Sequence, residues 1–321
     1  MKHAKTIQLY LMDGKPTGRI KASLANWTGM VIKIPRIALE SCSKDAIGTR
    51  RSYFNYSGVY FLFGNADEAE GLIDDISESK DVVYIGQANS RKNGEGILNR
   101  LVEHRRNPDK SYWKEAVVLT TSNNSLSSTE ISYLENRFCQ MAKEADRYLV
   151  KNSTEPSLGN ISEEKESELE EFIEYAQLVV GSLGFKVFTP MVETPIFSST
   201  QASEVGIGQK KAALNQNTIL YLKRAGNKSK KEIVAQGQQT SDGFVLLKGS
   251  EIERIDSSSV QPKIKALRQT AKIDVNNILQ EDILFGSPSY AGSFVLGTTC
   301  NGQERWKNEQ GVSLRDLEEN L

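Results

Sequence analysis

Two stretches, SGVYFLF at residues 57–63 and DVVYIG at residues 81–86, decide the fold of the first half of the chain. Both are short apolar runs rich in β-branched and aromatic residues, which favour β-strands. The segment between them, residues 64–80, is acidic and is expected to be a loop with some helix. The sequence therefore predicts two strands joined by a long connection.

The residues after the second strand continue with helices and one more strand. An amphipathic helix is predicted over 97–106, a short buried strand over 116–121, and a long helix after it. The long helix begins with Ser127 and Glu130, which have the spacing of a capping box. The order strand, strand, helix, strand, helix predicts an α+β module over residues 51–150.

The regions on either side of this module have weaker patterns. Residues 1–50 predict a small β region that precedes it, with strands at 6–12 and 30–34. Residues 151–160 are polar and rich in turn-forming residues, so the domain boundary is expected there. Residues 151–215 are then expected to be a helical linker region with a glutamate-rich amphipathic helix.

Residues 216–321 predict a separate α+β domain. Ser287 and Pro288 have the N-cap and first-turn pattern of a helix, and Gly297 is expected to end that helix. Asn301-Gly302 is typical of a two-residue β-hairpin turn. The expected strands of this domain cover residues 218–222, 232–235 and 244–247.

Composition excludes several classes of protein. Hydrophobic residues make up 38% of the chain and charged residues 25%, as expected for a globular protein rather than a disordered one. No apolar run reaches the roughly 18 residues that span a membrane, and the N-terminus has no apolar signal core, so we expect a cytoplasmic protein without a membrane partner. The cysteines Cys42, Cys139 and Cys300 are far apart, which disfavours a structural zinc site or a disulfide scaffold.

The net charge is −1, but the charge is unevenly distributed. Residues 1–50 contain nine Lys and Arg against three Asp and Glu, and residues 223–231 read KRAGNKSKK. Basic segments of this kind pair with the phosphates of nucleic acids, although a solvated protein surface has the same composition. We expect both segments to strengthen the binding of nucleic acid without taking part in chemistry.

Several side chains in residues 51–150 suit a common chemistry. Arg100 and His104 are four residues apart, on one face of a predicted helix. Glu135 lies on the apolar stripe of the long helix, where burying a carboxylate is costly unless Arg100 or a metal ion compensates it. Phosphodiester hydrolysis needs a hard cation, a cationic side chain and a base for water, which these residues and a tyrosine could supply. A structural Arg–Glu pair beside core tyrosines is the alternative.

The two strand motifs and the residues after them resemble a known family. GVY at 58–60 and YIG at 84–86 resemble the two halves of the signature of the GIY-YIG nucleases, and Arg100-Leu101, His104 and Leu134-Glu135 continue the match. The resemblance implies a core of a three-stranded antiparallel sheet flanked by helices. It also implies a metal-dependent endonuclease that hydrolyses phosphodiester bonds in nucleic acid, DNA in preference to RNA.

The resemblance further implies a role for each site residue. Glu135 would bind a single Mg²⁺ or Mn²⁺ ion, and Arg100 would stabilise the phosphoryl transition state. Tyr60 and Tyr84 would line the site, and either could orient or deprotonate the attacking water, with Tyr60 preferred as the base. His104 would contact phosphate or relay a proton.

The sequence departs from the family pattern at two places. The 23 residues between the tyrosines of the two motifs are more than is usual, which indicates an insertion at a hairpin tip. Gln87-Ala88 follows YIG where some relatives have a lysine, and Arg91 or Lys92 could substitute for it. Nucleic acid is expected to contact the basic residues Arg91, Lys92, Arg105 and Arg106.

Residues 232–321 resemble an uncharacterised domain that is often attached to GIY-YIG nucleases. The resemblance rests on FGSPS at 285–289, Asn301-Gly302, Trp306-Lys307 and Gly311. This domain is expected to bind substrate or a protein partner. Its residues Phe285 and Trp306 could stack on bases, although packing in a core is the more frequent role of such side chains.

Two other functions fit the sequence less well. The main alternative is a nucleic-acid-binding or regulatory protein with a catalytically silent module, but the intact Tyr60, Tyr84, Arg100 and Glu135 favour an enzyme. A small-molecule enzyme is disfavoured because the chain has two histidines, no clustered cysteines and no phosphate-binding glycine loop.

Overall fold

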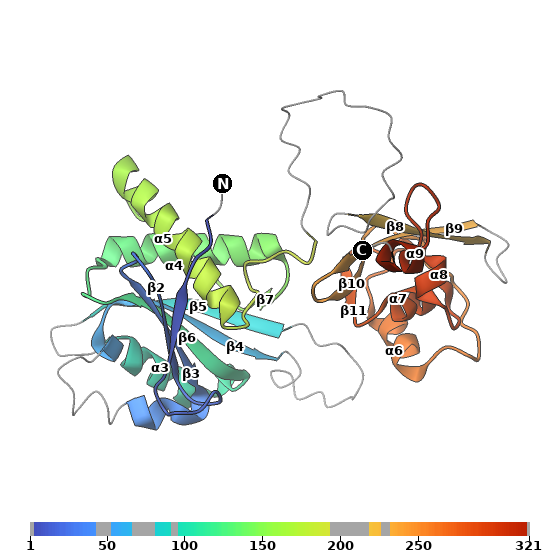
Figure 1. Ribbon diagram of the computed structural model, residues 1–321. Coiled ribbons are helices and arrows are strands. Elements are labelled where there is room, and N and C mark those ends of the chain that lie inside the picture. The colour runs from blue at the N-terminus through green and yellow to red at the C-terminus, as the bar shows by residue number, and fades with distance from the viewer. Residues whose placement is uncertain are drawn as a thin grey trace, which may run out of the picture. The chain divides into compact units, whose positions relative to one another are not determined.

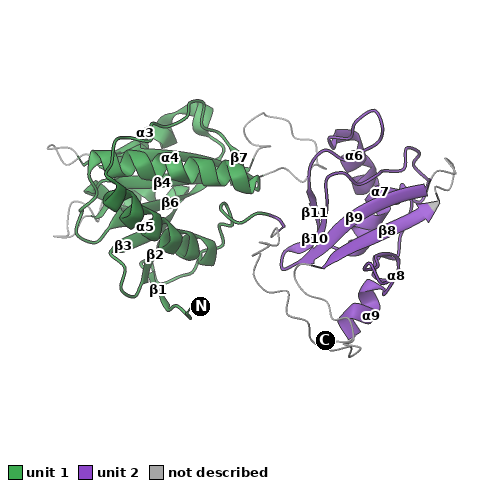
Figure 2. Cartoon of the chain, turned by 90° about the horizontal axis from the view of Figure 1, so that it is seen from above, with its two compact units in different colours: residues 1–73, 79–190 green, residues 74–78, 191–321 purple. Residues whose placement is uncertain are grey.

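The chain folds as two compact units, which divide after Pro190 (Figure 2). Each unit combines a β-sheet with helices, so the predicted α+β class is confirmed (Figure 1). No helix in the part of the chain that the structure describes is both long and apolar enough to cross a membrane. The computed structural model describes residues 3–42, 53–65, 81–90, 96–192, 218–225 and 232–319.

The first unit is built on one mixed β-sheet. Among the described residues the strand order is β1-β2-β3-β6-β4-β5-β7, and every neighbouring pair is antiparallel except β5 and β7. The three strands expected for the nuclease-like core, β6, β4 and β5, are neighbours in this sheet. The strands are β1 (Ile7–Leu11), β2 (Ile20–Leu24), β3 (Gly29–Pro35), β4 (Gly58–Asn65), β5 (Asp81–Ala88), β6 (Trp113–Thr121) and β7 (Leu149–Val150).

Strand β4 is buried on both of its faces, which is why it is a continuous apolar run. Successive side chains of a strand point to opposite faces of the sheet. Val59 and Phe61 belong to one hydrophobic core, and Tyr60 and Leu62 belong to another. The sheet therefore separates two cores. The tyrosine of the GVY motif, Tyr60, lies in the core that also contains Leu62.

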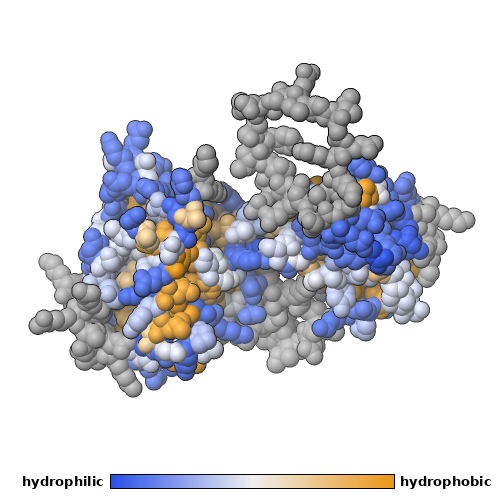
Figure 3. Space-filling model, viewed as in Figure 1, coloured by the Kyte–Doolittle hydropathy of each residue, from blue (hydrophilic) through white to orange (hydrophobic). Residues whose placement is uncertain are grey.

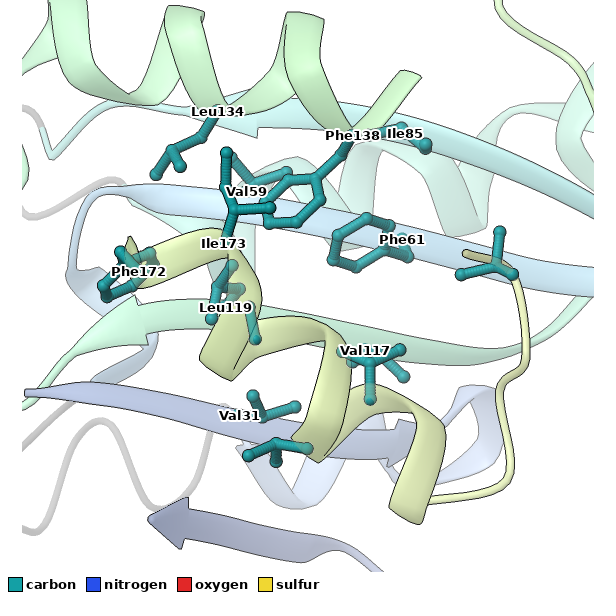
Figure 4. Packing of buried hydrophobic residues seen from close by; sticks show 14 of the residues in the cluster. Val31, Val59, Phe61, Ile85, Val117, Leu119, Leu134, Phe138, Phe172 and Ile173 are labelled. Atoms are coloured by element: carbon teal, nitrogen blue, oxygen red, sulfur yellow. The ribbon is translucent and has the colours of Figure 1, made fainter. Parts of the chain in front are cut away.

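Helices cover both faces of this sheet (Figure 1). On one face lie α4 (Ser128–Ala145) and α5 (Glu163–Ser182), and Figure 4 shows Phe138 of α4 next to Phe61, with ring centroids 5.3 Å apart. On the other face lies α3 (Ile97–Arg106), whose apolar residues share the core of Tyr60. Burial of these apolar faces is the main force that holds the layers together.

The N-terminal residues extend the sheet instead of forming a β region of their own. Strand β3 pairs with β6 over its whole length, from Gly29 opposite Thr121 to Pro35 opposite Glu115. The sheet is therefore larger than the three strands expected, because a free edge of β6 would leave apolar residues and backbone groups unpaired. Strand β2 was not predicted, since its alternating sequence IKASL has few strong strand formers.

Residues 151–190 of the expected linker region also belong to the first unit. Helix α5 follows the turn-rich stretch 151–160, where we expected the domain boundary. It does not lead away from the sheet, because its buried residues, among them Leu169, Phe172 and Ile173, join the core of Val59 and Phe61. The division between units therefore lies after Pro190, about one helix further along the chain. The rest of the expected linker, residues 193–215, lies outside the described residues.

The second unit contains an antiparallel sheet and several short helices. In its described residues the strand order is β11-β10-β9-β8. Its elements are β8 (Ile219–Ala225), β9 (Glu232–Thr240), β10 (Gly243–Leu246), α6 (Pro262–Thr270), β11 (Ile283–Phe285), α7 (Pro288–Leu296), α8 (Gly302–Arg305) and α9 (Leu314–Glu319).

Two local predictions in this unit had opposite outcomes. Helix α7 begins and ends as expected, since Ser287 Oγ accepts a hydrogen bond from Tyr290 N at 3.3 Å and Gly297 has φ 58°. The hairpin expected at Asn301-Gly302 was wrong, because helix α8 begins there. Gly302 packs against α7, where a Cβ atom would lie 2.2 Å from the carbonyl carbon of Pro288. Close packing, and not a turn, explains this glycine.

The two aromatic residues that could have stacked on bases are core residues. Trp306 is fully buried and donates from its indole nitrogen to the Pro288 carbonyl at 2.9 Å, and Phe285 is 2% exposed. Their ring neighbours are Phe244 and Phe294, at centroid distances of 4.7 and 5.3 Å. Stacking of Trp306 or Phe285 on a base would require this core to open.

Candidate active site

The two motif tyrosines lie on the same face of the sheet, on neighbouring strands. Tyr60 of β4 pairs with Gly86 of β5, and Tyr84 lies two residues before Gly86. The ring centroids of the two tyrosines are 6.4 Å apart. A Cβ atom at Gly86 would lie 2.3 Å from Tyr60 Oη, so the last residue of YIG must be glycine for the Tyr60 ring to cross over it.

This steric relation predicts the effect of Gly86→Ala. The added methyl group must displace a buried ring, so we expect unfolding to become easier by about 1–3 kcal/mol and any activity that depends on Tyr60 to fall. Thermal melting and a cleavage assay measure the two effects. Gly181→Ala in α5 is the control, since a Cβ there meets nothing within 4 Å. A Gly86 variant as stable and active as the Gly181 variant would contradict the steric explanation.

His104 is hydrogen-bonded to Tyr60. Helix α3 places His104 Nε2 2.7 Å from Tyr60 Oη, and only 6% of the histidine is exposed. Burial, then the nearby charges of Lys110 and Arg100, lower the pKa of His104 to about 4. Burial also raises the pKa of Tyr60 well above its ordinary value. Both groups are therefore neutral at pH 7, and the pair can pass a proton along one short hydrogen bond.

Arg100 lies one helical turn before His104, at the exposed end of the site. Its side chain is 49% exposed and forms an ion pair with Glu103 at 2.5 Å. An exposed pair of this kind contributes little stability and rearranges easily. The guanidinium also acts on Tyr60, where it partly offsets the rise of the tyrosine pKa. Arg100 is thus a cation near the tyrosines whose carboxylate partner is not Glu135.

Glu135 reaches the same region from α4, on the other face of the sheet. It is 9% exposed, and burial raises its pKa to about 7, although hydrogen bonds to Gln87 and the charge of Arg100 limit the rise. Its charge also raises the pKa of both Tyr60 and Tyr84. Within the described ranges no Lys, Arg or His forms an ion pair with Glu135. A cation bound from solvent would stabilise the ionised form.

Glu130, by contrast, is a capping residue, as predicted. Its carboxylate accepts a hydrogen bond from Ser127 N at 2.6 Å, and its own backbone N–H donates to Ser127 Oγ at 3.3 Å. Lys165 lies 3.4 Å from the same carboxylate. These contacts, mainly the hydrogen bonds with Ser127, outweigh burial and lower the pKa of Glu130. Its partners are all structural.

The ligands available for a metal ion are few. No cluster of three or more His, Cys, Asp or Glu side chains occurs among the described residues. A site with only one carboxylate suits Mg²⁺, since this ion keeps several waters and commonly uses one or two carboxylates together with substrate phosphates. The buried Glu135 carboxylate, which has no ion-pair partner in the described ranges, matches that requirement, and a bound divalent ion would favour its ionised form.

Sequence reasoning missed one residue of this site. Lys110 belongs to the short helix η3 (Pro108–Lys110) after α3, and its Nζ lies 3.1 Å from the centroid of the Tyr84 ring. The sequence around it, NPDK, has no relation in spacing to GVY or YIG. The only available signal was the Asn-Pro pair, which predicts a turn after α3 that returns the chain toward the sheet.

The structure describes two of the four basic residues expected to contact nucleic acid. Arg105 Nη2 lies 3.3 Å from Glu40, and Arg106 is exposed at the end of α3. They directly follow His104 in the sequence, and neither is part of the Tyr60–His104 contact. Arg91 and Lys92 lie outside the described residues.

Part of the basic charge of residues 1–50 is neutralised inside the fold. Arg19 forms an ion pair with Asp13 at 2.7 Å, and Lys33 forms one with Glu115 at 2.7 Å. Arg36 donates to backbone carbonyls, among them that of Lys110 at 3.0 Å. These three cations stabilise the protein, which weakens the argument that the N-terminal charge excess serves nucleic acid.

Comparison with known proteins concerns the second unit. Residues 227–318 match a family described as a domain of unknown function, DUF4357. Neither the comparison with curated proteins nor the comparison with solved structures found a match. The matched residues lie within the second unit and begin after strand β8, and the family description states no activity.

Proposed function

We propose that the first unit is a metal-dependent nuclease of the GIY-YIG type, which hydrolyses phosphodiester bonds in nucleic acid. The observation that carries this proposal is the meeting of Tyr60, Tyr84, Arg100, His104 and Glu135 at one region of the sheet. They come from two strands and two helices on opposite faces, so simple core packing does not account for the set. By the family resemblance, the substrate is DNA in preference to RNA.

The Tyr60–His104 pair suits the activation of water. The raised pKa of Tyr60 disfavours a free tyrosinate, so its hydroxyl acts best as a relay. As water attacks phosphorus, Tyr60 accepts the water proton and passes its own proton to a bare Nε2 of His104. The neutral state of His104 at pH 7 leaves that nitrogen able to accept. In the same displacement the bond from phosphorus to the leaving oxygen breaks, and that oxygen keeps the electron pair and takes up a proton from solvent.

The remaining residues manage charge on the phosphate. Arg100 would neutralise charge on the phosphoryl oxygens, and its exposed pair with Glu103 can give way to substrate. Glu135 would hold the divalent ion, which when bound supplies Lewis-acid polarisation of the phosphoryl group. Tyr84 lines the site, with its ring centroid 5.3 Å from that of His104 and 3.1 Å from Lys110 Nζ.

A cleavage assay tests this proposal. The full-length protein is incubated with Mg²⁺ or Mn²⁺ and a panel of duplex, branched and single-stranded DNA and RNA, with EDTA as the metal-free control. We expect cleavage of at least one substrate that requires the metal and is absent in the Glu135→Gln variant. Binding without cleavage of any substrate would instead support a catalytically silent module. Cleavage that persists in EDTA would contradict the metal-dependent mechanism.

The second unit offers a surface for nucleic-acid binding. A polar hollow of about 860 Å³ is lined by Lys223, Arg305 and Lys307, together with Tyr221 and two glutamates. Glu309 accepts a hydrogen bond from Tyr221, and Glu304 forms an ion pair with Arg315. Lys223, Arg305 and Lys307 can therefore contact phosphates. Figure 3 shows hydrophilic residues gathered over one side of this unit. The basic run 226–231 lies outside the described residues.

Neutralising Lys223, Arg305 and Lys307 to Gln tests this surface. If they contact phosphates of a duplex, binding should weaken and the slope of log K against log salt should fall by about 0.9 for each phosphate that is no longer neutralised. The maximal cleavage rate should not change. The control variant replaces the exposed lysines of other parts of this unit, Lys248, Lys263 and Lys265, which do not line the hollow. Equal slopes for the two triple variants would show that the hollow is only a solvated surface.

A further inference from the structure

Lys110 occupies an unusual place beside the two motif tyrosines. Its Nζ lies 3.1 Å from the centroid of the Tyr84 ring, on the face of the sheet that carries Tyr60 and is covered by α3. Its position is held by the backbone, since the Lys110 carbonyl accepts a hydrogen bond from Arg36 at 3.0 Å. Asn107 caps the short helix η3 by accepting from Asp109 N at 2.9 Å. The side chain is thus directed to the site by a fixed turn.

The surroundings of Lys110 are positive and partly dry. The side chain is half-buried, and none of the carboxylates that the structure describes forms an ion pair with it. Arg100 is close enough to disfavour its charged form, and Lys110 in turn disfavours a charged His104. Burial first, and then Arg100, lower the pKa of Lys110 to about 8, so most molecules keep the ammonium charged at pH 7.

Lys110 and Arg100 are two cations near each other, and Lys110 has no carboxylate partner among the described residues. What stabilises the charge of Lys110 there has to be explained. The attraction between an ammonium and an aromatic face partly offsets the burial of Lys110. It does not explain why the charge is kept within reach of Arg100. An anion bound between Lys110 and Arg100 would remove the repulsion and replace the hydration that Lys110 has lost.

We propose that the Lys110 ammonium binds a phosphate group of the nucleic-acid substrate, next to Tyr84 and together with Arg100. This inference rests on the proposed function. It assigns to Lys110 a direct contact with a phosphate oxygen. Packing on Tyr84 alone is the structural alternative, and it predicts no effect of the lysine charge on binding.

Binding can be measured apart from cleavage in the Glu135→Gln background with EDTA present. Labelled duplex, branched and single-stranded oligonucleotides are titrated at several salt concentrations, and the one bound best is used. Lys110→Met keeps the apolar stem over Tyr84 and removes the charge. We expect about tenfold weaker binding and, if the best substrate is a duplex, a salt slope smaller by about 0.9. Lys110→Arg should recover most of the affinity.

The controls separate this inference from the function on which it rests. Lys114→Met removes an exposed charge on β6 and should leave binding unchanged, and melting curves verify that every variant is folded. Should Lys110→Met fail to fold, Lys110→Gln serves as the neutral variant. Unchanged affinity and salt slope in the neutral variant would overturn the role of Lys110 while leaving metal-dependent cleavage by the wild type in place. Absence of cleavage by the wild type on every substrate would overturn the proposed function itself.

Discussion

Glu135→Gln is expected to abolish metal-dependent cleavage while the protein stays folded and still binds nucleic acid. The glutamine keeps the size of the side chain and its contact with Gln87 but cannot supply a charged metal ligand. A structural glutamate would behave differently, because removing one member of a buried ion pair typically costs about 3–5 kcal/mol. No described cation forms such a pair with Glu135, so we expect no loss of that kind.

The pH dependence of stability gives this prediction a second readout without metal. Because the folded pKa of Glu135, about 7, is above its ordinary 4.5, its contribution to stability is fully present below pH 4.5 and is lost as the pH rises through 7. The variant does not share this loss. Above pH 7 it should therefore be more stable than the wild type, by an amount on the order of 3 kcal/mol. Urea melts at pH 4.5 and pH 8 measure the difference.

Added metal should reverse this difference in the wild type alone. Mg²⁺ or Mn²⁺ stabilises the state that binds it, so it should raise the melting temperature of the wild type at pH 8 but not that of Glu135→Gln. Glu130→Gln is the matched control on the same helix. It should lose on the order of 1 kcal/mol or less from its cap and keep cutting. If Glu130→Gln fails to cut and Glu135→Gln still cuts, the metal ligand is Glu130.

Arg100→Ala should lower turnover by about two or more orders of magnitude and lower affinity much less. The guanidinium is placed where it can stabilise charge that develops on the phosphoryl oxygens, which is an interaction stronger in the transition state than in the bound substrate. Single-turnover rates at saturating substrate measure the first effect, and binding in EDTA measures the second. Stability should change little, since the pair with Glu103 is exposed.

Glu103→Gln is the control for Arg100. It breaks the same ion pair but leaves the guanidinium, so turnover should persist. The difference in turnover between Glu103→Gln and Arg100→Ala then measures the catalytic contribution of the guanidinium. Arg100→Lys keeps a positive charge but lacks the planar pair of N–H donors, so its turnover should lie between those of Arg100→Ala and Glu103→Gln. Should Arg100→Ala reduce affinity and turnover by the same small factor, Arg100 positions substrate and does not stabilise the transition state.

The sequence predicted those features that depend on neighbours within a few residues. The capping box of Ser127 and Glu130 and the start of α7 at Ser287 are hydrogen bonds within one helical turn, so the side chains that form them can be read together in the sequence. The apolar runs that form β4 and β5 were equally clear, because most residues of each strand are buried and therefore apolar. The same locality explains the failure at Asn301-Gly302, where contact with α7 overrode a turn signal.

The motif residues were identified by resemblance, but their arrangement was decided in space. The tertiary structure placed His104 against Tyr60, paired Arg100 with Glu103 instead of Glu135, and brought Lys110 over Tyr84 from an unrelated turn. Only the packing of two helices on opposite faces of one sheet brings such distant groups together.

The N-terminal strands also show that sequence patterns do not reveal which segments pair in the folded protein. The apolar runs of β1 and β3 indicated strands, but their sequence carried no sign of their partners. Strand β3 joined β6, some eighty residues later, because the pairing fills the free edge of the core sheet. The sequence alone determined the strands and helices with strong apolar patterns, such as β4, β5 and α4, and which residues suit phosphodiester chemistry. Tertiary structure decided which of them meet, since such contacts depend on pairing and burial across the whole chain and not on neighbours along it.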